Sequence, residues 1–234
     1  MVFNETQVLF LKKILKENYD NEKYYEEILS TKVDLHFIKT FEESLNFEFF
    51  FRYSILNPET IKYIYKNKLY ESNEGGFLRF NKLDIEDLTD YIKNGNNIDW
   101  EILLENQDFT SKLLTENIKN LNWEITSEYQ YMDYKFLTEN IKNIKWHLVP
   151  LNHKITNSIN EAFVIMFKET DIWDNIGYCD NISLEFLLKN KDKLTEKSWS
   201  SILEYKKISK ENLINCSDLN SLVIDYSSDS DLEI

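Results

Sequence analysis

The sequence predicts an all-α protein, a right-handed α-solenoid of about seven short two-helix repeats with an N-terminal helical cap. Three observations predict it: regularly spaced tryptophans, two nearly identical segments, and very little glycine or proline. With 4 Gly and 2 Pro among 234 residues, the chain lacks the turn residues that an all-β sandwich or barrel needs. Short units that recur at a fixed period bury their apolar faces by stacking on one another.

The repeat is clearest at the five tryptophans, which are separated by 23, 23, 27 and 26 residues. They are Trp100, Trp123, Trp146, Trp173 and Trp199. Two segments that end on a tryptophan agree at eight of eleven positions, since residues 113–123 read LLTENIKNLNW and residues 136–146 read FLTENIKNIKW. The shared pattern is an apolar pair, two variable residues and an asparagine, with the tryptophan ten residues after the first position.

Weaker copies of the apolar pair occur before and after these two segments. They are Phe37-Ile38, Tyr63-Ile64, Tyr91-Ile92, Phe163-Val164 and Phe186-Leu187, with a half-copy at 208–214. About seven units therefore fill residues 33–214, which we expect to form the repeat domain.

One unit is expected to contain two short helices. Asp133 can accept hydrogen bonds from the free amides of a first helical turn, and the apolar pair follows it. Asn140 stands where the first helix should stop, in the left-handed conformation that asparagine tolerates. Asn122 and Asp99 each precede a Trp-Glu-aliphatic run, which indicates a cap and a second helix. We expect the tryptophans to be buried between neighbouring units.

Leucine-rich repeats are the alternative fold, because they also run 20 to 29 residues and carry an asparagine. Their leucines alternate along a strand before that asparagine. Here the two apolar residues are adjacent, and Glu, Lys and Leu dominate between them. The helical interpretation is therefore preferred.

Segments outside the pattern define the remaining organisation. Residues 1–32 are expected to form the N-terminal cap, because residues 8–15 and 22–29 have helical character. Residues 71–82 contain Gly75-Gly76 and break the rhythm, which predicts a hinge or an inserted loop. Residues 215–234 are expected to be a C-terminal segment with an acidic disordered tail. Serines among the acids of this tail also resemble substrates of acid-directed kinases.

Charge narrows the class of partner. The formal net charge is −14 and only two arginines occur, Arg52 and Arg79. Nucleic-acid binders gain most of their affinity from basic side chains on phosphates, so we expect no direct nucleic-acid binding and instead a protein partner with a basic surface. The N-terminus has no signal-peptide pattern, and no apolar run is long enough to cross a membrane. With two cysteines, a cytoplasmic location is expected.

Catalytic and metal-binding patterns are missing from the sequence. His147 and His153 are six residues apart, whereas two helical metal ligands want a spacing of three or four. Cys179 and Cys216 are 37 residues apart, with no histidine nearby to complete a zinc site. We expect no catalytic residues, no cofactor and no metal. Convergence of distant side chains leaves an enzyme as a remote alternative.

The copies LLTENIKNLNW and FLTENIKNIKW resemble repeats in uncharacterised proteins of mimivirus-like large DNA viruses. The resemblance covers residues 33–214 and implies no catalytic residue. It implies a viral protein that acts on host or viral proteins in the infected cytoplasm.

These observations together predict a non-enzymatic protein–protein interaction scaffold or adaptor. The alternative is an acidic nucleic-acid mimic that inhibits a DNA- or RNA-binding protein, which requires a regular row of carboxylates along one face. Lysines interspersed along that face would count against the mimic. The pattern assigns neither binding residues nor an oligomeric state.

Overall fold

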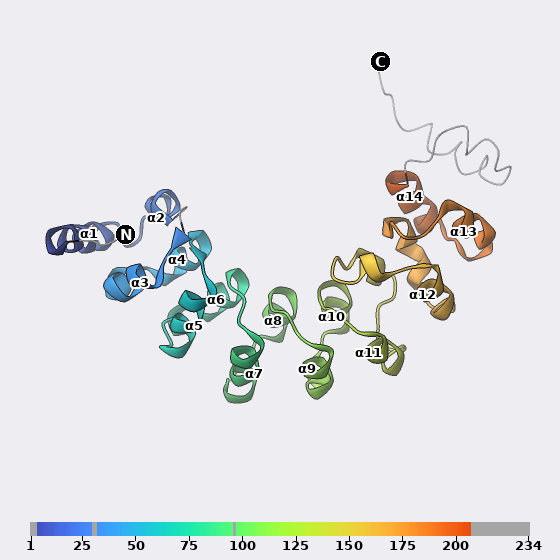
Figure 1. Ribbon diagram of the computed structural model, residues 1–234, viewed down its shortest axis with the longest axis horizontal. Coiled ribbons are helices and arrows are strands. Elements are labelled where there is room, and N and C mark those ends of the chain that lie inside the picture. The colour runs from blue at the N-terminus through green and yellow to red at the C-terminus, as the bar shows by residue number, and fades with distance from the viewer. Residues whose placement is uncertain (1–3, 30–31, 96, 207–234) are drawn as a thin grey trace, which may run out of the picture. The chain divides into compact units, whose positions relative to one another are not determined.

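A computed structural model describes residues 4–29, 32–95 and 97–206 of the protein, and the described chain is mostly helical (Figure 1). It divides into two compact units, Met1–Asn143 and Ile144–Ile234. The division falls inside the region where we expected one continuous set of repeats. The predicted half-copy at 208–214, Cys216 and the acidic tail lie outside the described residues.

The first unit contains eleven α-helices among its described residues, with short 3₁₀ helices between some of them. The α-helices are α1 (Glu5–Glu17), α2 (Glu22–Leu29), α3 (Leu35–Phe41), α4 (Phe47–Tyr53), α5 (Pro58–Lys66), α6 (Glu74–Phe80), α7 (Ile85–Asn94), α8 (Trp100–Asn106), α9 (Ser111–Glu116), α10 (Trp123–Tyr129) and α11 (Tyr134–Glu139). The 3₁₀ helices are η1 (Glu42–Ser44), η2 (Glu71–Asn73) and η3 (Ile118–Asn120), and two short strands are β1 (Lys32–Val33) and β2 (Ile55–Leu56).

The helices of the first unit alternate between two rows (Figure 1). In one row α2 packs on α4, α4 on α6, α6 on α8 and α8 on α10. In the other row α3 packs on α5. The strands β1 and β2 pair in parallel, with Lys32 opposite Ile55 and Val33 opposite Leu56. This helical arrangement, rather than a strand in every unit, excludes the leucine-rich alternative for the described residues.

The predicted apolar pairs all lie on helices. Those of the first unit lie on α3, α5, α7, α9 and α11. The second member of the pair is fully or almost fully buried at Ile38, Ile64, Leu114 and Leu137. On α7 the register differs, because the buried residues are Leu88 and Tyr91, together with Asp87. The pattern therefore located one helix of each predicted repeat in the first compact unit correctly.

The predicted capping residues at the starts of individual helices are confirmed. The side chains of Asp99, Asn122 and Asp133 each accept a hydrogen bond from an amide in the first turn of α8, α10 and α11. These caps offset the free donors at the start of a short helix.

Asparagine does end the helices, but the predicted left-handed conformation is wrong. Asn117 has φ −115° and ψ 21°, and Asn140 has φ −116° and ψ 21°. The side-chain amide of Asn140 donates to the carbonyl of Phe136 at 2.9 Å, and that of Asn117 donates to Leu113 at 2.8 Å. The side chain thus satisfies a carbonyl of the last turn directly, so no left-handed residue is needed.

Buried glutamines join consecutive helices of the first row, a feature that the sequence pattern did not indicate. Gln107 and Gln130 follow α8 and α10 directly, and both are 0% exposed. The Gln130 side-chain amide donates to the carbonyls of Leu104 at 2.5 Å and Gln107 at 2.8 Å, and its oxygen accepts from the Phe109 amide at 3.0 Å. These backbone groups lie in the last turn of α8 and just after it. Gln130 therefore completes α8, the previous helix of the same row.

Gln107 makes the equivalent contacts one repeat earlier in the chain. Its side-chain amide donates to the carbonyls of Leu78 at 2.5 Å and Asn81 at 2.8 Å, and its oxygen accepts from the Leu83 amide at 2.9 Å. The two glutamines are 23 residues apart, the same spacing that separates Trp100 from Trp123. They therefore belong to the repeat.

The prediction of a hinge or loop at 71–82 is wrong, because Gly75 and Gly76 lie in the first turn of α6. The Gly76 amide donates to Asn73 Oδ1 at 3.2 Å, and a Cβ on Gly76 would lie 2.2 Å from Asn73 Nδ2. A Cβ on Gly75 would lie 3.4 Å from Ile102 Cδ1 on α8. Gly76 therefore makes room for the Asn73 cap, whereas a Cβ on Gly75 would be in ordinary van der Waals contact with α8.

The predicted N-terminal cap does form two helices, α1 and α2. However, α2 packs on α4 as later helices of this row pack on one another, so it continues the row. Leu9 and Phe10 on α1 are largely exposed, while Leu15 is buried.

The second unit contains fewer α-helices and more 3₁₀ turns. Its elements are η4 (Val149–Leu151), η5 (Thr156–Ser158), α12 (Glu161–Met166), η6 (Asp171–Tyr178), α13 (Leu184–Lys189), η7 (Lys191–Lys193) and α14 (Glu196–Tyr205). The main packing is between η6 and α14. There a Cβ on Gly177 would lie 2.3 Å from the backbone carbon of Ser201, so glycine permits the close approach.

The two-helix prediction fails after Trp146, where η4 replaces a second α-helix. Asp99 and Asn122 precede the other helix-starting tryptophans, but Lys145 stands before Trp146 and cannot accept from a free amide. In an α-helix that starts at Trp146, the N–H of residue 150 would donate to the Trp146 carbonyl. Pro150 has no N–H, so this hydrogen bond cannot form.

Burial of the tryptophans is confirmed for two of them. Trp146 is 2% exposed and stacks on Phe167, with ring centroids 4.2 Å apart. Trp173 is 4% exposed and stacks on Phe186 at 6.1 Å. The other three, Trp100, Trp123 and Trp199, are partly exposed. Among the described residues, no helix combines the length and the apolar character that crossing a membrane requires.

Candidate functional site

A polar hollow of the first unit is lined by residues of α5, α6 and α7 and of the segment between α5 and α6, and we name it the α5–α7 hollow. It has a volume of about 460 Å³. It is lined by Tyr65, Lys66, Lys68, Tyr70, Glu71, Glu74, Asp90, Tyr91, Asn94 and Gly95. Aromatic rings and charged groups of both signs therefore converge there.

The local sequence builds this hollow where the repeat rhythm changes. Lys68 adopts φ 57°, and its amide and that of Leu69 donate back to the end of α5. The chain then passes through η2, which lies between α5 and α6. Tyr70, just before η2, stacks on Tyr65 at 5.6 Å and on Phe77 at 5.3 Å between ring centroids. Of these stacked rings, those of Tyr65 and Tyr70 form an apolar wall of the hollow.

Two tyrosine hydroxyls hold two carboxylates in place. Tyr91 donates to Glu74 Oε1 at 2.7 Å, and Tyr65 donates to Asp90 Oδ2 at 2.9 Å. The Asn94 amide donates to Asp90 Oδ1 at 2.9 Å. Both tyrosines are nearly buried, at 7% exposed for Tyr65 and 5% for Tyr91.

Burial raises the pKa of Tyr65 and of Tyr91, and the neighbouring carboxylates raise both pKa values further. Each tyrosine therefore remains a hydrogen-bond donor throughout the neutral range. The hollow contains acceptors and donors suited to binding a charged group.

The lysines of the hollow already have acidic partners. Lys66 Nζ lies 2.7 Å from Asp87 Oδ1 and 4.9 Å above the centre of the Tyr65 ring. Lys68 Nζ lies 3.2 Å from Glu71 Oε1. In the described part of the chain, no cationic nitrogen lies within 4.0 Å of the Glu74 or Asp90 carboxylate.

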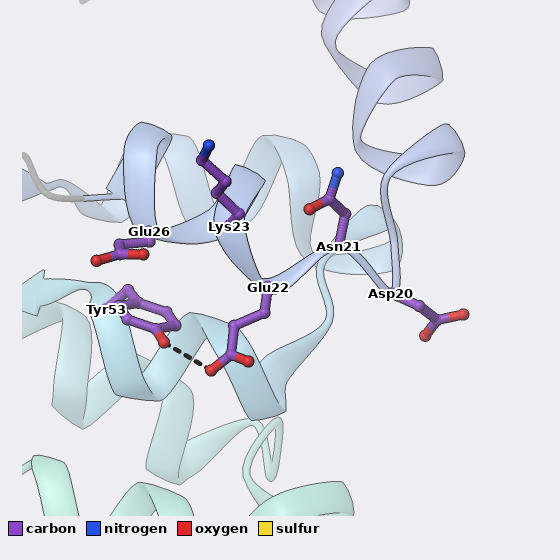
Figure 2. Close-up of a pocket in the computed structure, with 6 residues that line it drawn as sticks. All are labelled: Asp20, Asn21, Glu22, Lys23, Glu26 and Tyr53. Carbon is purple, nitrogen blue, oxygen red and sulfur yellow. Dashed lines mark hydrogen bonds between the residues drawn. The ribbon is translucent and has the colours of Figure 1, made fainter.

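A second hollow, of about 730 Å³, contains another tyrosine-bound carboxylate (Figure 2). Tyr53 donates to Glu22 Oε1 at 2.6 Å, and Arg52 Nη1 lies 2.5 Å from the same oxygen. Both contacts lower the pKa of Glu22, and the hydrogen bond from Tyr53 has the larger effect. Here the carboxylate has both a tyrosine and a guanidinium donor.

A third hollow, of about 380 Å³, lies between α9 and α11. Its glutamates, Glu116 and Glu139, have lysine partners on the same helix, Lys112 at 3.8 Å and Lys135 at 3.9 Å. The hollow thus resembles the first in size but contains carboxylates that are already paired.

The histidines of the second unit occupy different surroundings. His147 Nδ1 lies 3.0 Å from Asp171 Oδ2, whereas His153 lines a hollow of about 400 Å³ with Tyr178 and Pro150. No group of three or more metal-ligating side chains gathers within residues 4–29, 32–95 and 97–206.

The residues of the α5–α7 hollow were not predicted from the sequence to form a binding site, although Tyr91 was named in an apolar pair. Tyr65 directly follows the recognised pair Tyr63-Ile64, and Glu74 lies within the segment 71–82 that breaks the rhythm. That break was the available signal, although it was interpreted as a hinge. The tertiary approach of α5, α6 and α7 places Glu74 and Asp90 in the lining of the same hollow, and no spacing along the chain encodes this approach.

Comparison with protein-family models, with curated proteins and with solved structures found no match for this chain.

Proposed function

We propose that this protein is a non-enzymatic interaction scaffold, an α-solenoid that binds a protein partner through a basic surface of that partner. The observation that carries the proposal is the regular packing of α2, α4, α6, α8 and α10 in one row. Stacked units of this kind offer extended surface rather than a deep pocket. The in-register glutamines support the same inference, because they join one unit to the next.

Charge supports a basic partner. The formal net charge is −14, so a basic surface would be attracted over a long range and would bind faster at low salt. By the resemblance of the repeats, we further propose that the protein acts on host or viral proteins in the cytoplasm of an infected cell.

A nucleic-acid mimic is the less favoured function. Lysines alternate with glutamates on exposed helix faces, as in the pairs Lys13–Glu17, Lys112–Glu116 and Lys135–Glu139. Such alternation breaks up the uniform negative field that a mimic of the phosphate backbone would need. It counts against the mimic on α1, α9 and α11.

Affinity purification with mass spectrometry, followed by reconstitution from purified components, tests the proposal. The partner should be stoichiometric and basic, and its affinity should fall as salt rises from about 50 to 500 mM, since screening shortens with ionic strength. Absence of a stoichiometric partner across this salt range would contradict the scaffold. Turnover of a small molecule by the purified chain would also contradict it.

A further inference from the structure

We propose that the α5–α7 hollow binds an arginine side chain of the partner, with the guanidinium accepted by Glu74 and Asp90. This inference rests on the proposed function for its biological setting. Its chemistry rests on the hollow itself and can be tested without the partner.

The Glu22 site shows how this chain completes a tyrosine-bound carboxylate. There one carboxylate oxygen accepts from both a tyrosine hydroxyl, that of Tyr53, and the guanidinium of Arg52. At Glu74 the tyrosine donor is present, because Tyr91 donates to it at 2.7 Å. A guanidinium is the group that would make the two sites equivalent.

The remaining lone pairs of Glu74 and Asp90 suit such a donor. Each Asp90 oxygen has one neutral donor, Tyr65 or Asn94, and a carboxylate oxygen can accept two. Guanidinium presents five N–H donors in a planar fork, so one group can serve two carboxylates at once. Ammonium is a compact charge with three donors and lacks this geometry.

The lysines that line the hollow do not take the place of the proposed arginine. Lys66 is bound to Asp87 and Lys68 to Glu71. The lining residues include three acids, Glu71, Glu74 and Asp90, against two cations, Lys66 and Lys68, so a net charge of −1 remains to attract a cation. The apolar stem of an arginine would contact the partly exposed ring of Tyr70.

The experiment measures binding of N-acetyl-arginine amide to the full chain by amide chemical-shift changes in NMR spectra. N-acetyl-lysine amide is the ammonium probe, and N-acetyl-citrulline amide is the neutral probe of matched shape. Two double variants are compared with the natural chain: Glu74→Gln with Asp90→Asn, and the control Glu116→Gln with Glu139→Gln. Both change the net charge by the same amount, so any difference between them is local to the hollow.

The arginine probe is expected to shift the amides that line the hollow, with saturation at millimolar concentration. The first double variant should bind it at least about tenfold more weakly, the effect of losing charge-assisted hydrogen bonds, and the control should bind as the natural chain does. Citrulline should leave these amides unchanged. If the first double variant loses its helical signal, Glu74→Gln alone replaces it, because Glu74 is exposed.

Three results would overturn the proposal: no shift in the hollow, equal binding by the two double variants, or lysine bound as tightly as arginine. The scaffold proposal would survive any of them, because it depends on recovery of a protein partner. Conversely, failure to recover a partner would leave arginine binding in the hollow intact as a measured property.

Discussion

Replacing Gln130 by leucine tests whether the buried glutamines join the units of the first row. The side chain has about the same volume, but it offers neither the amide donors nor the carbonyl acceptor. The substitution strands the carbonyls of Leu104 and Gln107 and the amide of Phe109, which Gln130 contacts at 2.5, 2.8 and 3.0 Å. All three residues are buried, so water does not reach these groups without rearrangement.

The cost follows from the number of stranded groups. An unsatisfied buried donor or acceptor costs about 1–3 kcal/mol, so three would cost at most about 9 kcal/mol. Local relaxation and the apolar gain of leucine reduce this, and we expect a loss of about 3–5 kcal/mol in the free energy of unfolding. That is a large part of the roughly 5–15 kcal/mol by which a domain is stable.

Urea unfolding followed by circular dichroism gives the free energy, and hydrogen exchange locates the loss. The Phe109 amide should exchange slowly in the natural chain and much faster in the Gln130→Leu variant. Gln7→Leu is the control, because Gln7 is exposed and contacts only the start of α1. A loss below about 1 kcal/mol, with the Phe109 amide still protected, would refute the role assigned to the glutamine.

Three further predictions concern the core and pH. Trp146→Ala should cost about 3–5 kcal/mol as a large-to-small core change, and more than Trp123→Ala at a partly exposed site; thermal melts that rank them in reverse would contradict the burial pattern. Gly177→Ala should cost at least about 1–3 kcal/mol, measured by urea unfolding, because its Cβ would press on the backbone of α14; an unchanged midpoint would show that α14 moves freely. The raised pKa values of Tyr65 and Tyr91 stabilise the fold fully below the tyrosine pKa of about 10, and this contribution is lost as pH rises above it. The double variant Tyr65→Phe with Tyr91→Phe removes both titrating groups. Between pH 8 and 11, the free energy of unfolding measured in urea should fall more steeply for the natural chain than for this variant, and parallel curves would contradict this linkage.

Local rules gave the helix starts correctly, because they depend on neighbouring residues alone. Asp133 accepts from the first turn of α11 as predicted, and Asn140 stops that helix. The geometry of the stop was wrong because side-chain capping at Phe136 competes with the left-handed backbone. Both devices satisfy the same carbonyls, and composition does not distinguish them.

Features that depend on tertiary approach could not be predicted in the same way. Gly75 and Gly76 suggest a break when only the chain is considered, whereas in the fold a Cβ on Gly76 would meet the side chain of Asn73, which caps the helix that contains both glycines. The α5–α7 hollow depends on Glu74 and Asp90, which are sixteen residues apart on different helices. Gln107 and Gln130 were detectable, since their spacing equals that of the tryptophans, but glutamine is more often a surface residue.

The direction of the glutamine contacts has a consequence for synthesis of the chain. Each glutamine lies C-terminal to the helix that it completes, since Gln130 serves the end of α8 and Gln107 serves the end of α6. On a ribosome, α8 therefore emerges unfinished and acquires its last hydrogen-bond partners only after a further unit has been translated. A nascent chain stopped just before Gln130 would contain α9 and α10 but would leave the end of α8 without these partners, so completion of a helix in this row must trail its synthesis by about one repeat.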